Sequence, residues 1–98
     1  MGFREAKSKV IKCLNNGCIL HEERNSIDTK NLLSTGVVSI SELASIISRA
    51  RGNEYSYSPH HYNEKIDVHI IKTINSGRQW YIKWYFIDPD CVFISVHI

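Results

Sequence analysis

Residues 66–98 read IDVHIIKTINSGRQWYIKWYFIDPDCVFISVHI, and apolar and polar side chains alternate along most of this stretch. A period of two is typical of strands that bury one face. Asn75-Ser76-Gly77 and Asp88-Pro89-Asp90 interrupt the alternation and are turn sequences. The stretch therefore predicts three consecutive antiparallel strands with one apolar face. The expected strands are residues 65–74, 78–87 and 91–98.

The chain before these strands predicts helices. Residues 3–16 place their apolar side chains on one stripe, and Gly17 follows as a C-cap. Residues 40–51 form a second amphipathic pattern, which Ser39 and Glu42 begin as a capping box.

Between and after these helices the pattern is weaker. A short helix at 28–34, begun by Ser26 or Asp28, fits between the two long helices. Residues 18–26 fit either an edge strand or a loop, and so do residues 54–63, where Pro59 argues against a central strand. We therefore expect one α+β domain over residues 1–98, with N-terminal helices packed on one face of a C-terminal antiparallel sheet.

Composition narrows the function classes. The 98 residues are 43% hydrophobic and 22% charged, with a net charge of +2, which excludes a disordered tail and a collagen-like repeat. No run reaches the roughly 18 apolar residues of a membrane helix, and the N-terminus does not resemble a secretory signal, so we expect no membrane partner. Three cysteines, an odd number, favour the reducing cytoplasm.

The turns suggest a register for the three strands. Pairing Ile74 with Arg78, and Ile87 with Cys91, brings an unusual set of side chains to the solvent face. That set is His69, Tyr81, Lys83, Tyr85, Ser95 and His97. Residues 54–63 would add Tyr55, Tyr57, His60 and His61 at the edge.

This composition is suited to a ribonuclease that needs no metal. A base takes the proton of the ribose 2′-OH, an acid protonates the leaving 5′ oxygen, and a cation stabilises the phosphorane. Histidine can do either proton transfer near neutral pH. Lys83 or Arg78 can supply the cation, while tyrosines can stack on unpaired bases. The same side chains are also ordinary on a solvated sheet face.

The order of elements resembles that of MqsR-type toxins, which are messenger-RNA interferases of the wider RelE-like ribonuclease group. The resemblance extends over nearly the whole chain. It is closest from Ile66 through Lys83 and in residues 92–97. In that family a glycine precedes a Tyr-aliphatic-Lys strand, and a basic residue closes the last strand.

The resemblance implies a toxin with a cognate antitoxin, an RNA substrate and no cofactor. Tyr81 matches the strand tyrosine, Lys83 the lysine after it, and His97 the basic residue near the C-terminus. The predicted catalytic residues are His97, Tyr81, Lys83, His60 and His61. The predicted substrate-binding residues are Arg78, Lys72, His69, Tyr57 and Tyr85. We expect no metal ligands.

Three alternatives stay open. The protein is a non-enzymatic binding module, such as an antitoxin, an immunity-like protein or a phage-type inhibitor, if the aromatic face docks a protein. It binds RNA without cleavage if its affinity depends on salt while RNA stays intact. Cys13, Cys18 and His21 offer zinc-ligand chemistry, although at an irregular spacing.

Overall fold

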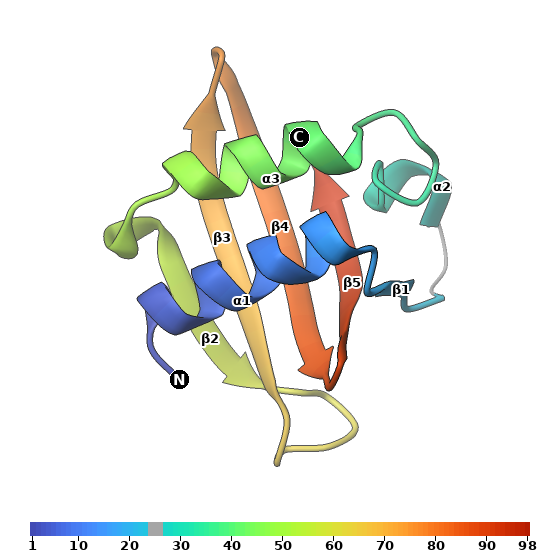
Figure 1. The fold of residues 1–98 in the computed structure, drawn as a ribbon, viewed down its shortest axis with the longest axis vertical. Coiled ribbons are helices and arrows are strands. Elements are labelled where there is room, and N and C mark those ends of the chain that lie inside the picture. Colours follow the sequence, from blue (N-terminus) through green and yellow to red (C-terminus); the bar gives the residue numbers. More distant parts are fainter. Residues whose placement is uncertain (24–26) are drawn as a thin grey trace.

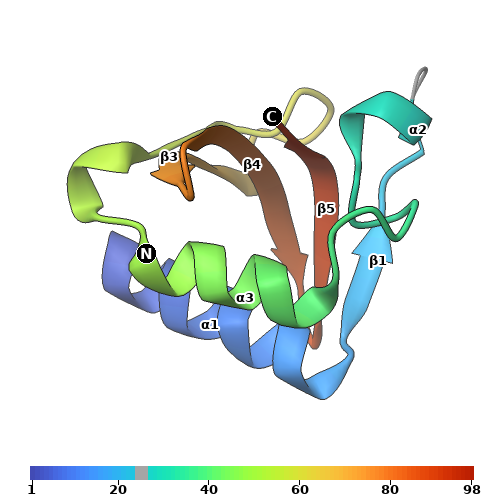
Figure 2. The same cartoon turned by 90° about the horizontal axis from the view of Figure 1, so that it is seen from above.

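A five-stranded mixed sheet is the centre of the fold, and two helices cover one of its faces (Figures 1 and 2). The computed structural model describes residues 1–23 and 27–98. In chain order the elements are α1 (Phe3–Asn16), β1 (Ile19–His21), α2 (Ile27–Lys30), α3 (Ile40–Arg49), the 3₁₀ turn η1 (Gly52–Glu54), β2 (Tyr55–Pro59), β3 (Asp67–Asn75), β4 (Arg78–Ile87) and β5 (Asp90–His97). The strand order is β1-β5-β4-β3-β2.

The two long helices begin and end where local chemistry places them. Gly17 closes α1 in the left-handed conformation, with φ at 73°, and its amide donates to the Leu14 carbonyl. The Ser39 hydroxyl caps α3 by accepting from the Glu42 amide at 3.1 Å. The helix ends at Arg49, two residues before the predicted end, because the backbone of Ala50 is extended.

The segments with weak sequence patterns form short strands and a short helix. β1 and β2 are the edge strands of the sheet, where the sequence left a choice between strand and loop. The short helix α2 ends at Lys30 and not at residue 34, because Asn31 forms an isolated bridge with Val96 of β5. The predicted start at Ser26 lies outside the described residues, as does the side chain of Asp28.

The α+β class is confirmed, with one correction to the sheet. Strands β3 to β5 pair antiparallel as predicted, and β2 also pairs antiparallel with β3. However, β1 pairs parallel to β5, with Leu20 opposite Val92. The sheet is therefore mixed. The chain can place β1 there because α2 and α3 come between β1 and the rest of the sheet.

The predicted register of the first hairpin is wrong by one residue. Asn75 pairs with Arg78, so the turn is the two residues Ser76 and Gly77, with φ of 52° and 75°. Positive φ at both positions is the turn geometry that matches the twist of paired strands. A shift of one residue moves every side chain of β3 to the other face, His69 among them.

The second hairpin agrees with prediction over part of its length. Tyr81 pairs with His97, and Lys83 pairs with Ser95, as expected. A β-bulge then shifts the register, so that Trp84 pairs with Phe93. The predicted pairing of Ile87 with Cys91 is wrong, because Ile87 pairs with Asp90. The predicted pairing would put Phe93 opposite Tyr85 on the solvent face, whereas Phe93 lies under the helices and is fully buried.

The core fills the layer between the helices and the sheet. Figure 2 shows α1 and α3 on one side of the strands, with the loop after β2 on the other. The largest fully buried side chains are Trp84, Phe93, Leu14, Leu43, Ile47, Ile71 and Ile82. This one-sided packing leaves the opposite face of the sheet available for a site.

Candidate functional site

The face of the sheet turned away from the helices carries the polar side chains, and we call it the open face. Strand alternation and register assign it Lys72, Ile74, Gln79, Tyr81, Lys83, Tyr85, Ser95 and His97. Successive members along β4 lie about 7 Å apart. Their side chains therefore form one continuous strip.

Three of these residues form a row across neighbouring strands. Lys72 of β3 pairs with Tyr81 of β4, which pairs with His97 of β5. The Tyr81 and His97 rings stack, with centroids 5.3 Å apart and planes 20° apart. The Lys72 ammonium lies 5.7 Å from the centre of the Tyr81 ring. The predicted pairing of Ile74 with Arg78 would put Ile71 opposite Tyr81, whereas the observed register puts Lys72 there.

The hydrogen bond of His97 decides which ring nitrogen can accept a proton. Nδ1 lies 3.2 Å from the main-chain oxygen of Ile98, and an oxygen of this kind only accepts. Nδ1 therefore carries the hydrogen in the neutral ring, and Nε2 carries the lone pair. Within the part of the chain that the structure describes, Nε2 has no protein partner. This is the state that a general base requires.

Residues 60–66, here called the strap, cross the other end of the open face. The strap is closed by its own hydrogen bonds: the His60 amide donates to the Ile66 carbonyl at 2.8 Å, and the Ile66 amide donates to the Asn63 carbonyl at 2.9 Å. The His60 ring packs edge-on against Tyr85, with centroids 4.8 Å apart. The strap is therefore a folded segment seated on β4.

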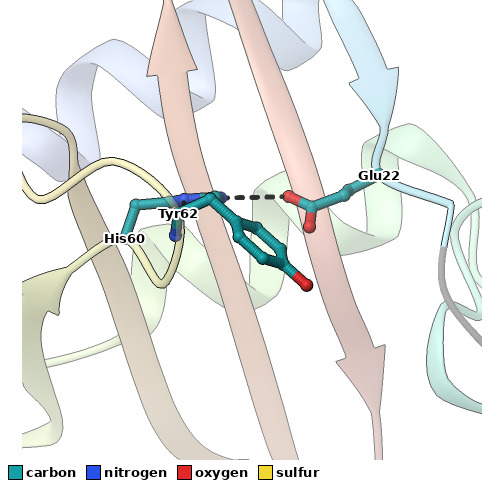
Figure 3. A network of polar contacts seen from close by, with 3 residues as sticks. All are labelled: Glu22, His60 and Tyr62. Atoms are coloured by element: carbon teal, nitrogen blue, oxygen red, sulfur yellow. Dashed lines mark hydrogen bonds and ion pairs between the residues drawn. The ribbon is translucent and has the colours of Figure 1, made fainter.

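A polar contact between His60 and Glu22 ties the strap to the end of β1. Figure 3 shows His60 and Glu22 facing each other across the open face, joined by a contact of 3.4 Å between Nε2 and Oε2. The His60 side chain is only 9% exposed and that of Glu22 only 18%. The main-chain amide of Glu22 donates to the Phe93 carbonyl at 2.9 Å, which continues the pairing of β1 with β5.

Both ring nitrogens of His60 are engaged. The Tyr62 amide donates to Nδ1 at 3.1 Å, so Nδ1 must accept and the hydrogen of the neutral ring is on Nε2, facing Glu22. His60 therefore has no lone pair to offer a ribose hydroxyl. In this arrangement His60 holds the strap in place, and of the two predicted proton transfers it is not placed to act as the base.

The strap, the end of β1 and the open face enclose a hollow of about 760 Å³. Its lining residues are Glu22, Glu23, Ser58, Pro59, His60, His61, Tyr62, Val68, Lys83 and Ile94. Of the predicted residues, His60, His61 and Lys83 meet here, and the Tyr85 ring packs against His60. A cation, two imidazoles and two carboxylates thus share one hollow.

Three predicted substrate-binding residues lie away from this face. His69 is 3% exposed on the helix side, because of the one-residue change in register. Arg78 lies three residues before Tyr81 on β4, so the two side chains are on opposite faces of the sheet. Arg78 lines a separate hollow together with Arg49 of α3. Tyr57 pairs with His69 and so points to the helix side of the edge strand. The structure therefore does not bring these three to the proposed site.

The His69 side chain is held inside the protein by Tyr55 and Trp84. Its Nδ1 lies 2.7 Å from the Tyr55 hydroxyl, and its ring stacks on Trp84 at 5.5 Å. Burial lowers the pKa of His69 below its ordinary value of 6.5, because the charged ring would lose its hydration. The side chain is held neutral in the core.

The zinc alternative finds no support in the geometry. Cys13 donates from Sγ to the Pro89 carbonyl at 3.7 Å, and Nδ1 of His21 pairs with the Asn31 amide at 3.0 Å. Across residues 1–23 and 27–98, no group of three His, Cys, Asp or Glu side chains has the arrangement of a metal site. In the same residues, no helix is long and apolar enough to cross a membrane.

The comparisons with known proteins add no relative. No family model matches this sequence, and no curated protein matches it. The open face itself must therefore indicate what the protein does.

Sequence reasoning missed Glu22. The segment around it fitted a loop as well as a strand, and its partner His60 is 38 residues away. The one available signal was the run of two glutamates at 22 and 23, the only adjacent pair in the chain, beside a possible edge strand. That signal names no partner, because long-range pairing depends on the assembled sheet.

Proposed function

We propose that this protein is an endoribonuclease toxin that cleaves single-stranded RNA without a metal, with a RelE-like fold of the MqsR type. The observation that carries the proposal is the row of Lys72, Tyr81 and His97, in which the lone pair of His97 Nε2 is available. Cleavage by a ribose 2′-OH needs a base, an acid and a cation, and this cross-strand row supplies the base and the cation. The match of Tyr81, Lys83 and His97 to the family residues supports the same reading.

The reaction can be written for these groups. His97 Nε2 takes the proton of the 2′-OH, the 2′ oxygen forms a bond to phosphorus, and the bond from phosphorus to the 5′ oxygen breaks. The products are a 2′,3′-cyclic phosphate and a 5′-OH. Tyr81 orients the phosphate, while Lys72 and Lys83 stabilise its added negative charge. His61 is the remaining imidazole near Lys83, and we assign it the proton for the leaving oxygen.

Cleavage of a defined single-stranded RNA in EDTA tests the proposal. Wild-type protein should leave cyclic-phosphate ends, and His97→Ala should lose at least a hundredfold in rate, because general-base catalysis contributes about 10²–10⁴. His97 lies at the end of β5 and is partly exposed, so the variant should keep its circular dichroism spectrum. Intact RNA with the wild type, with or without ribosomes, would refute the proposal.

Two lysine substitutions distinguish a specific role of Lys83 in catalysis from an effect of the net charge of the protein. Lys83→Ala should slow cleavage severalfold or more, because it removes a cation from the open face. Lys12→Ala removes the same charge from the exposed side of α1, on the far side of the sheet, and should leave the rate unchanged. Equal effects of the two changes would mean that only the net charge matters.

A cognate antitoxin in the cytoplasm completes the proposal. An inhibitor would have to cover the row at His97, and exposed apolar side chains on the same face, Leu20 of β1 and Ile74 of β3, offer it contact area. Those two side chains also favour the second candidate, a protein-binding module without activity. That candidate predicts intact RNA, and a partner whose affinity falls when Leu20 or Ile74 is replaced.

A further inference from the structure

Tyr62 is a large aromatic residue that the fold holds in solvent. It is 84% exposed, although it belongs to a strap that is closed by hydrogen bonds and tied down by His60 and Glu22. Its amide donates to Nδ1 of His60 at 3.1 Å, which fixes the start of the side chain. An exposed ring on an ordered segment, beside a polar hollow, is the arrangement of a stacking platform.

The neighbours of Tyr62 orient its ring without stacking on it. The His61 ring meets it edge-on at 4.9 Å and 81°, and the His60 ring is tilted at 6.1 Å and 48°. Figure 3 shows the Tyr62 ring beside the contact between His60 and Glu22, over the open face. The contact between His60 and Glu22 thus holds the strap that carries the Tyr62 ring.

The charged side chains that line the hollow determine where the phosphate of a bound nucleotide can lie. Lys83, on the sheet side of the hollow, attracts a phosphate, while Glu22 and Glu23 in the same lining repel one. Val68 and Ile94 form an apolar part of the sheet side and are nearly fully buried. A volume of about 760 Å³ is within the range of small-molecule sites.

We propose that the hollow binds one unpaired nucleotide of a single-stranded RNA, with its base stacked on Tyr62 and its phosphate at Lys83. Lys83 lies two residues along β4 from Tyr81, so the bound nucleotide neighbours the one whose 2′-OH faces His97. His60 and Glu22 act as positioning residues that hold the strap. The inference rests on the proposed ribonuclease function and assigns part of its substrate to the strap.

Binding of an RNA that cannot be cut isolates this step. The probe is a short fluorescein-labelled 2′-O-methyl oligoadenylate, whose blocked 2′ oxygen prevents cleavage, and the readout is fluorescence anisotropy. Tyr62→Ala should raise the Kd about tenfold, the loss of one base stack. Tyr62→Phe keeps the ring and should bind like the wild type. Tyr57→Ala removes another exposed tyrosine from the opposite side of the sheet, and should change nothing.

The outcomes distinguish this inference from the function on which it rests. If the wild type cleaves RNA and Tyr62→Ala binds the probe as tightly as the wild type, the stacking site is wrong and the ribonuclease stands. If Tyr57→Ala weakens binding as much as Tyr62→Ala, the effect is not specific to the strap and the inference also fails. If the wild type neither binds nor cleaves RNA, both proposals fall.

Discussion

Tyr55 and His69 form a hydrogen bond between neighbouring strands, and removing one oxygen atom tests its contribution. The Tyr55 hydroxyl lies 2.7 Å from Nδ1 of His69. Tyr55→Phe deletes only that oxygen and keeps the ring, which packs against Phe3 at 5.4 Å and His69 at 5.9 Å. An unpaired buried polar group costs about 1–3 kcal/mol. Because Tyr55 is half-buried and admits some water, we expect the free energy of unfolding to fall by about 1–2 kcal/mol.

Urea unfolding, followed by tryptophan fluorescence, measures this loss. The midpoint should fall while the slope stays constant, and the melting temperature should fall by about 4–8 °C for each kcal/mol. Tyr57→Phe is the matched control, because Tyr57 lies on the same strand and is 60% exposed. Its replacement should cost less than about 0.5 kcal/mol.

Two results would refute the reasoning. One is a Tyr55→Phe midpoint equal to that of the wild type, which would mean that the hydrogen bond contributes nothing to stability. The other is an equal loss in Tyr57→Phe, which would show that a tyrosine hydroxyl on β2 matters whatever it contacts.

Two further predictions concern the buried titratable groups. Burial lowers the pKa of both His69 and His21, so the folded protein binds fewer protons than the unfolded chain, and stability should fall as the pH drops from 7 through 6.5 towards 5. A urea midpoint that rises on acidification would contradict this sign. Burial also raises the pKa of the Cys91 thiol, which is fully buried, whereas Cys18 is partly exposed. A disulfide reagent such as DTNB should therefore label Cys18 first and Cys91 only after unfolding, and equal rates in the folded protein would show the burial to be wrong.

Local patterns were sufficient for the helices and for one part of the site. Gly17 and Ser39 act within a few residues of themselves, so the end of α1 and the start of α3 could be predicted from sequence. The pairing of Tyr81 with His97 was predicted as well. The pairing is reached by another route than the one predicted: the turn pairs Ile87 with Asp90, and the bulge after Lys83 shifts the register back by one residue. The turn sequence alone does not show this bulge.

The face of β3 that turns to the core could not be predicted from the residues of β3 alone. One face of the strand carries His69 and Ile71, and the other carries Ile70 and Lys72, so each face offers an apolar side chain to the core. The length of the turn decides which face is buried, and Asn75-Ser76-Gly77 is compatible with a turn of two residues or of three. The two-residue turn moved His69 into the core and Lys72 to the open face.

The sequence by itself determined the α+β class, the two long helices and a strip of Tyr81, Lys83 and His97 on consecutive strands, because periodicity, caps and short turns act between near neighbours. Only the tertiary structure decided that β1 joins the sheet in parallel, that the strap returns across the open face and that Glu22 meets His60. These contacts join residues tens of positions apart. Their formation depends on which surfaces stay open after the core has packed, and no local pattern records that.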